Sequence, residues 1–183
     1  MGHGGNVIDE LMTDHREVEE MFARVQALPA GDERRREVAN EFTIELVRHS
    51  VAEEQYLYPA VREHVPGGEE LADKEVADHA TVEKLLKDLE DVDCGDARFG
   101  ILVDRIIDEV SAHIRDEEQN LFPALAGVCS AEQLDELGDQ VRRAKKLAPT
   151  RPHPNAPDNK LLAAGTGLVD RARDLITGRG KSS

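Results

Sequence analysis

The feature that most restricts the fold of this chain is an internal repeat. Two stretches match at a constant offset of 64 residues, which is the separation of Asp14-His15 from Asp78-His79. The other matched residues include His49 with His113, and Glu53-Glu54-Gln55 with Glu117-Glu118-Gln119. No gap interrupts the match. The repeat therefore predicts two equivalent helical hairpins that pack about a pseudo-two-fold axis.

Apolar residues at helical spacing divide the repeated region into four segments. The first begins after a predicted N-cap at Asn6 and ends at Pro29, and the second runs from about Asp32 to about His64. The third ends before Cys94, and the fourth begins at Asp96 and ends before Pro123. Pro59 is expected to kink or split the second helix, because proline has no N–H and clashes with the preceding turn. The prediction is an all-α, antiparallel up-down-up-down four-helix bundle with a C-terminal helical extension.

The sequence also predicts four parts along the chain. Residues 1–128 form the bundle, and residues 129–148 form an additional short helix that begins at a capping box, Ser130 with Gln133. Residues 149–159 hold four prolines and are predicted to be an extended linker. Residues 160–183 are predicted to be an amphipathic helix and tail, whose apolar stripe needs a partner surface, either on the bundle or on another subunit.

Composition excludes several classes of partner. The chain of 183 residues has a net charge of −15, which repels nucleic acid and anionic membrane surfaces. No apolar run approaches the ~20 residues that cross a bilayer, and no signal peptide is visible at the N-terminus. Two cysteines are too few for a disulfide framework. The expected location is the cytoplasm.

Six polar residues continue the apolar stripes into the predicted bundle interior. They are matched in pairs by the repeat: His15 with His79, His49 with His113, and Glu53 with Glu117. Burying such groups without partners costs several kcal/mol, an order-of-magnitude figure. Metal ions remove this cost, because they bind neutral imidazole and carboxylate directly. The six residues are therefore the predicted metal ligands.

The donor types narrow the choice of metal. Imidazole nitrogen and carboxylate oxygen without thiolate suit iron, manganese or zinc, whereas calcium and magnesium prefer oxygen ligands. A structural zinc ion usually needs four ligands, so six favour a binuclear centre. In that interpretation Glu53 and Glu117 bridge two ions, and each ion has two terminal histidines.

Further residues near these ligands leave alternatives open. Tyr56 is either a core tyrosine or a phenolate ligand. Glu19 and Glu83 follow His15 and His79 by four residues, and they either lie on a solvated face or hold imidazole N–H groups, or act as extra ligands. Glu54 and Glu118 are expected to face outward.

These motifs resemble the hemerythrin-like HHE cation-binding family. The matching residues are Asp14-His15, His49-Ser-Val-Ala-Glu53-Glu54, Asp78-His79 and His113-Ile-Arg-Asp-Glu117-Glu118, each Glu pair being followed by Leu57-Tyr58-Pro59 or Leu121-Phe122-Pro123. The resemblance covers about residues 7–126, and the tail is similar to extensions in actinobacterial members. It implies a cofactor of two non-haem iron ions with an oxo or hydroxo bridge.

The sequence departs from the oxygen-carrying members in one respect. Those carry a second histidine four residues from the one on the third helix, whereas here Glu75 and Glu83 stand at those positions. Two histidines on each iron leave an open position on both ions, a pattern that resembles the peroxide-decomposing members.

The expected function is catalase-like decomposition of hydrogen peroxide, with reaction with nitric oxide as a further activity. The alternative is a protein that senses oxygen or redox state, or handles iron, without turnover. The expected partners are peroxide, oxygen or nitric oxide, and the oligomeric state is left open.

Overall fold

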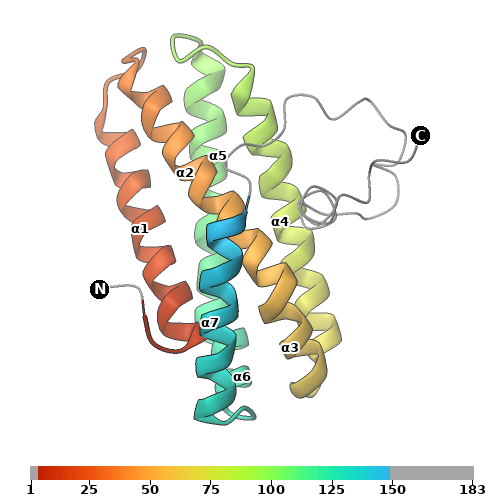
Figure 1. Cartoon of the computed structure of the whole chain (residues 1–183). Coiled ribbons are helices and arrows are strands. Elements are labelled where there is room, and N and C mark those ends of the chain that lie inside the picture. Colours follow the sequence, from red (N-terminus) through yellow and green to blue (C-terminus); the bar gives the residue numbers. More distant parts are fainter. Residues whose placement is uncertain (1–3, 149–183) are drawn as a thin grey trace, which may run out of the picture.

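The computed structural model describes residues 4–148 and shows an antiparallel helical bundle (Figure 1). Its four long helices are α1 (Val7–Ala27), α2 (Arg34–Ala52), α4 (Gly68–Glu90) and α5 (Ala97–Asp116). α1 packs against α2, and α4 packs against α5, so each half of the repeat is a hairpin. Every regular element within these residues is helical, which confirms the predicted all-α class.

The helix ends follow the capping signals of the sequence. The Asn6 side chain accepts hydrogen bonds from the backbone N–H groups of Ile8 and Asp9, and Asp96 accepts one from Arg98. These caps satisfy amide groups that have no partner inside the helix. Gly67, with a φ of +76°, provides the left-handed residue that turns the chain into α4.

Each hairpin contains one turn of π-helix at the same place in the repeat. Five residues, Glu53–Leu57 (η1), separate α2 from α3 (Tyr58–His64), and Glu117–Leu121 (η2) separate α5 from α6 (Phe122–Ala126). In both turns a backbone N–H bonds to the carbonyl five residues earlier, from Tyr58 to Glu53 and from Phe122 to Glu117. The prolines that follow lack an N–H, and the wider turn relieves the clash that a proline causes in an α-helix. The predicted split of the second helix at Pro59 is present in this form.

The apolar core has two main parts, beside a small cluster of Val47, Val51 and Ala148. The first apolar cluster is built from α1, α2, α4 and α5 and includes Val18, Phe22, Phe42, Leu46, Val82, Leu86, Phe99, Ile106 and Val110. The second apolar cluster lies toward the π turns and includes Leu11, Leu57, Tyr58, Val61, Leu121, Phe122, Leu125, Leu134 and Val141. Along α1, α2 and α4, one histidine stands between residues of the two clusters, and His113 lies near the end of α5, before the residues of the second cluster in η2 and α6.

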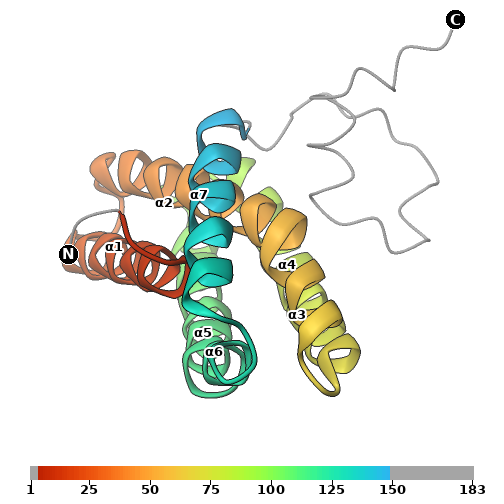
Figure 2. The same cartoon turned by 60° about the horizontal axis from the view of Figure 1, so that its bottom comes forward.

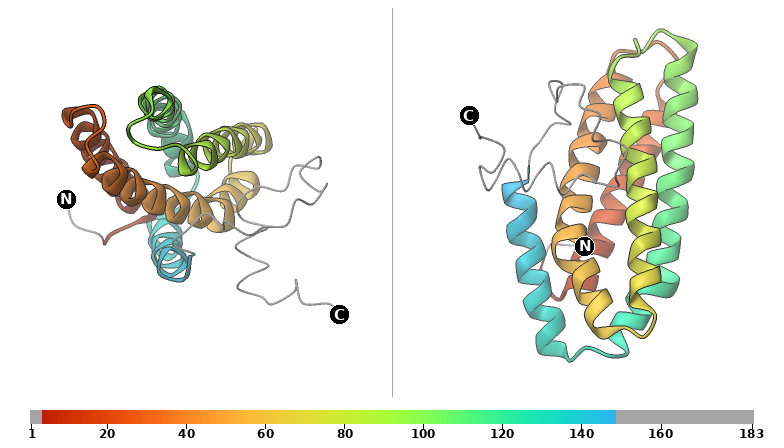
Figure 3. Two further views of the ribbon diagram at one scale, coloured as in Figure 1. Left: turned by 90° about the horizontal axis from the view of Figure 1, so that it is seen from above. Right: turned by 90° about the vertical axis from the view of Figure 1, so that its right-hand side faces the viewer.

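A fifth long helix, α7 (Ala131–Leu147), runs along the outside of the bundle (Figures 2 and 3). It begins at the predicted capping box, in which Ser130 and Gln133 bond each other's backbone N–H. It packs against α1 and α2, and its buried face joins the second apolar cluster. A Cβ atom on Gly138 would lie 2.8 Å from the Gly5 carbonyl oxygen, so only glycine permits this close approach.

Two of the predicted parts, the linker 149–159 and the helix and tail 160–183, lie outside the described residues. Among the helices of residues 4–148, none combines the length and apolar character that crossing a lipid bilayer requires.

Candidate metal centre

A layer of buried polar side chains separates the two apolar clusters. It holds His15 from α1, His49 from α2, His79 from α4 and His113 from α5, together with Glu53 and Glu117, the first residues of the two π turns. Both glutamates are 0% exposed, and the four histidines are 2–6% exposed. The structure thus brings all six sequence-predicted residues together at one level of the bundle.

The six residues form two groups, and each hairpin supplies the histidines of one group. In the first, His49 Nε2 lies 3.0 Å from Glu53 Oε1, and His15 Nε2 lies 3.3 Å from Glu117 Oε2. In the second, His79 Nε2 lies 3.3 Å from Glu53 Oε2 and 3.2 Å from His113 Nε2. His113 Nε2 is also 3.6 Å from Glu117 Oε2.

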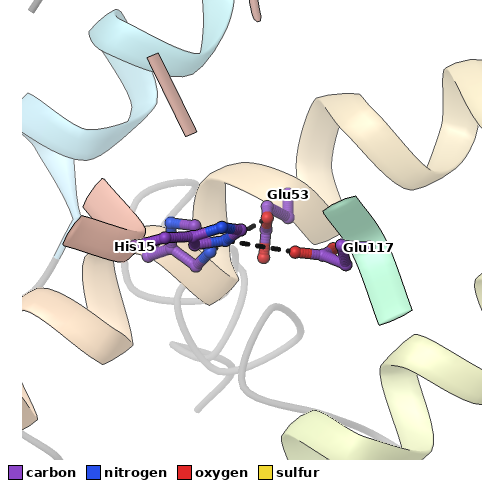
Figure 4. A group of neighbouring side chains, drawn as sticks. His15, Glu53 and Glu117 are labelled. Atoms are coloured by element: carbon purple, nitrogen blue, oxygen red, sulfur yellow. Dashed lines mark ion pairs between the residues drawn. The ribbon is translucent and has the colours of Figure 1, made fainter. Parts of the chain in front are cut away.

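The two carboxylates are shared between these groups. Figure 4 shows the His15 imidazole facing Glu53 and Glu117, which approach from the opposite side. One Glu53 oxygen contacts His49 and the other contacts His79. Potential ligand atoms lie within 4.8 Å of one another in three overlapping sets. These are His15, His49, Glu53 and Glu117; Glu53, His79 and His113; and Glu75, His113 and Glu117. This arrangement matches a centre in which two cations share carboxylates.

Every histidine of the centre has a second carboxylate beside its Nδ1 atom. Three of these pairs are hydrogen-bonded, whereas His113 and Glu75 form an ion-pair contact without hydrogen-bond geometry. These contacts are His15 with Glu118 (2.9 Å), His49 with Asp14 (3.1 Å), His79 with Glu54 (3.0 Å) and His113 with Glu75 (2.7 Å). A carboxylate at Nδ1 fixes the imidazole so that its Nε2 faces the centre, which is the usual support of metal-bound histidine.

The position of Glu54 and Glu118 corrects the expectation that they face outward. The extra residue of each π turn rotates them from the outer face toward the neighbouring hairpin, where they meet His79 and His15. Glu75 was also missed, because its repeat counterpart is Leu11 and the repeat therefore gave no signal for it. Its position four residues before His79, on the same helical face, was the sequence signal that could have placed Glu75 near the centre.

Glu19 and Glu83 do not hold the imidazoles of His15 and His79, because Glu118 and Glu54 occupy those Nδ1 positions. Glu19 instead pairs with Arg16 at 2.5 Å on a partly exposed face of α1. Glu83 is half-buried on α4.

The tyrosine at the centre is Tyr58 and not Tyr56. The Tyr58 hydroxyl lies 3.1 Å from Glu117 Oε1, 3.2 Å from His79 Nε2 and 3.4 Å from Glu53 Oε2. Tyr56 is half-buried and packs against the second apolar cluster. The expectation for Tyr56 assumed an unbroken α-helix, in which a residue three positions after Glu53 shares its face. The π turn moves that face to the residue five positions on.

Tyr58 makes the two halves of the centre unequal. Its repeat counterpart is Phe122, which stacks on the His15 ring with ring centroids 5.7 Å apart. One half of the centre therefore has a phenol hydroxyl where the other has a phenyl ring.

The electrostatics of the metal-free centre show what its residues require. Burial lowers the pKa of His79, but Glu53 and Glu54 outweigh burial and raise that pKa to about 9. Burial raises the pKa of Glu53, but His49 and His79 bring it well below its usual range. Burial, and then Glu117, raise the pKa of the Tyr58 hydroxyl well above its ordinary value. Protons on His49 and His79, whose pKa values are both raised, thus balance charge on the buried carboxylates.

Several atoms of the centre nevertheless remain without hydrogen bonds. Within residues 4–148, His15 Nε2, Glu53 Oε1 and Glu117 Oε2 are buried and have no hydrogen-bond partner. Buried polar atoms are rarely left in this state. All three point into the space between the imidazoles and the carboxylates, so the donor set fits bound cations.

Comparison with known proteins agrees with this geometry. The family model of the hemerythrin HHE cation-binding domain matches residues 6–125. The chain belongs to the hemerythrin HHE family. The matched range contains all six residues of the centre, so this hemerythrin domain is a metal-cation-binding unit, and α7 lies beyond it.

Individual relatives extend the comparison. An uncharacterised hemerythrin-like protein of Schizosaccharomyces pombe is 29% identical over 175 residues, which cover 93% of this chain and 86% of the relative. A protein of Nostoc sp. named DNA nickase is 29% identical over 143 residues, which cover 76% of this chain but 39% of that protein. The crystal structure of a hemerythrin HHE cation-binding domain-containing protein from Mycobacterium kansasii superposes with a TM-score of 0.69 at 22% identity, covering 91% of this chain and 98% of that one. That likeness concerns the fold.

Proposed function

We propose that this protein binds two non-haem iron ions and decomposes hydrogen peroxide, with reaction with nitric oxide as a further activity. His15 and His49 would hold one ion and His79 and His113 the other, with Glu53 and Glu117 bridging them. An iron pair supplies the two-electron redox chemistry needed to convert two hydrogen peroxide molecules into two waters and one oxygen.

The observation that carries the proposal is the sharing of Glu53 and Glu117. Each carboxylate contacts a histidine of both hairpins, as two bridging ligands require. A single ion would not explain two separate imidazole pairs, with ring centroids 5.0 Å apart in one pair and 4.8 Å apart in the other. The nitrogen and oxygen donor set, without thiolate, is compatible with iron.

Peroxide chemistry, rather than simple storage, is supported by the small number of protein ligands. Two imidazoles and two shared carboxylates do not fill the coordination of an iron ion, so each ion retains room for an exogenous ligand. The Tyr58 hydroxyl has a raised pKa and therefore stays protonated in the metal-free protein. It contacts the Glu53 and Glu117 carboxylates, next to the position where an exogenous ligand would bind. It is therefore placed to donate a hydrogen bond there.

The DNA-directed activity in the name of the Nostoc relative is not part of this proposal. The match spans 39% of that protein, and the net charge of −15 of this chain opposes binding to phosphate.

The metal content is tested first, by elemental analysis of protein purified without added metal. We expect about two iron atoms per chain. His49→Ala should lower this value, whereas His64→Ala, a change to a half-buried histidine at the end of α3, should not. Zinc in place of iron would reject the proposal.

The activity is then tested with an oxygen electrode. Iron-loaded protein should evolve oxygen from hydrogen peroxide above the rate of an equal amount of free iron. A fully loaded protein that evolves none, and instead forms a stable, reversible spectrum when the reduced form meets air, would point to the alternative of oxygen or redox sensing.

A further inference from the structure

A small cavity adjoins the candidate metal centre on the side of the first apolar cluster. Its volume is about 20 Å³, room for one molecule of about the size of water. The four histidines of the centre line it, together with the apolar side chains of Val18, Leu46, Val82 and Val110. A ligand bound to the ions would therefore find mostly apolar walls around it.

Apart from Asp14, whose repeat counterpart Asp78 is not part of the lining, the cavity follows the internal repeat with one exception. Val18 corresponds to Val82, and Leu46 corresponds to Val110, so these walls are apolar in both halves. The exception is the residue after the α2 and α5 histidines, which is Ser50 in one half and Ile114 in the other. Both line the cavity. One side of the cavity thus carries a hydroxyl group that its symmetric counterpart lacks.

The Ser50 hydroxyl is available for a ligand. Ser50 is 8% exposed, and the structure gives it no hydrogen bond to any residue between 4 and 148. The helical threonines differ from Ser50 in this respect, since Thr43 on the same helix donates to the Ala39 carbonyl and Thr81 donates to the Ala77 carbonyl. Because Ser50 lines the cavity and its hydroxyl is not used by the described part of the protein, this hydroxyl can donate a hydrogen bond to a molecule bound there.

We propose that Ser50 donates a hydrogen bond to the oxygen-bearing or anionic ligand that enters this cavity, and that it directs this ligand toward the His49 side. This inference rests on the proposed binding of iron, and it identifies the ligand class as a small molecule that places one hydrogen-bond acceptor atom in a space of about the size of water. Ile114 offers no such bond, so the ligand binds the two halves of the centre unequally.

Azide is a suitable probe, because it is a small anion that binds to ferric iron and changes its absorption. We expect Ser50→Ala to weaken azide binding to the iron-loaded protein about tenfold, the effect of one hydrogen bond to a charged group. Ser111→Ala, which removes a half-buried hydroxyl of α5 away from the cavity, should leave the affinity within about twofold.

The repeat supplies a rescue experiment. Ile114→Ser places a hydroxyl at the symmetric position, so the double variant Ser50→Ala/Ile114→Ser should recover most of the azide affinity. Ile114→Ser alone should bind azide more tightly than the unaltered protein. If Ser50→Ala does not retain iron, the azide affinity of Ile114→Ser shows whether a hydroxyl at the cavity strengthens ligand binding. Unchanged azide affinity in Ser50→Ala, or in Ile114→Ser when Ser50→Ala loses iron, overturns the inference.

The outcomes separate this inference from the proposed function. Protein that binds two irons and azide but evolves no oxygen from peroxide contradicts the proposed activity alone. Protein that evolves oxygen but shows no change in azide affinity on loss of the Ser50 hydroxyl contradicts the role of Ser50 alone.

Discussion

Four carboxylates orient the four imidazoles, and they differ in how they are themselves held. Asp14 also contacts Lys145 of α7, Glu118 contacts Arg16, and Glu75 contacts Lys74 at 3.3 Å. For Asp14, burial raises the pKa of the carboxyl, but His49 and Lys145 outweigh burial and lower that pKa, which keeps Asp14 ionised. Contacts therefore link the cations of Lys145, Arg16 and Lys74, through the carboxylates, to the imidazole rings of the centre.

Replacement of one such carboxylate tests its role. Glu75→Gln keeps the size of this fully buried side chain but removes the charge that faces His113 Nδ1. We expect iron affinity to fall about 10- to 100-fold, the usual effect of losing a carboxylate behind a metal-bound histidine. Competition with a chelator measures the change. Glu70→Gln, at an exposed position of the same helix, is the matched control and should have no effect.

The two tyrosines of η1 and α3 form a second matched pair. If the Tyr58 oxygen binds iron as phenolate, the ferric protein will show a phenolate-to-iron absorption band in the visible range. Tyr58→Phe should abolish that band, and Tyr56→Phe should keep it, because the hydroxyl near His79 belongs to Tyr58. Retention of the band in Tyr58→Phe would exclude the phenolate ligand.

At the scale of elements, α7 covers α1 and α2, and Gly138 sets how closely it approaches. Gly138→Ala would bring a Cβ atom 2.8 Å from the Gly5 carbonyl oxygen and 3.0 Å from the Val7 nitrogen, so α7 would have to shift. We expect a loss of about 1–3 kcal/mol in the free energy of unfolding, measured by urea denaturation.

A second glycine provides the control for this substitution. In the interior of α5, a Cβ atom on Gly100 would meet nothing closer than 4.0 Å. Gly100→Ala should therefore stabilise the protein by about 0.5–1 kcal/mol. Equal effects of the two substitutions would contradict the proposed close contact of α7 with the start of α1.

The elements also show how far the sequence could predict the structure. The helical hairpins, their caps and the meeting of the six residues follow from apolar periodicity and the 64-residue offset, because both are local or repeated signals. The π turns were not predicted, since their hydrogen bonds leave no mark on composition beyond the following proline. One extra residue per turn was enough to exchange Tyr56 for Tyr58 and to bring Glu54 and Glu118 inward. Glu75 lies outside the repeat pattern, so only the packed structure reveals its contact with His113.

For the whole molecule, metal binding and protonation compete for the same imidazoles. In the metal-free protein the pKa of His49 is raised well above 6.5 and that of His79 to about 9, so both carry protons at pH 7. An incoming cation must displace these protons, and its affinity should therefore rise with pH from 6 to about 9.

Calorimetric titration of metal-free protein with ferrous iron in buffers of different ionisation enthalpy measures the release. Roughly two protons per chain should leave at pH 7, and fewer at pH 9. An affinity that does not change between pH 6 and pH 8 would show that the imidazoles are already neutral before the metal arrives.

Two of the four contacts at Nδ1 cross between the halves of the molecule in a reciprocal way. His15 of the first hairpin is held by Glu118 of the second, and His79 of the second is held by Glu54 of the first. Neither hairpin forms a complete metal-binding half-site by itself, since each supplies a carboxylate that supports a histidine of the other. One hairpin alone would lack the carboxylate that orients its first histidine, so the two hairpins must pack together before either histidine pair is fully oriented.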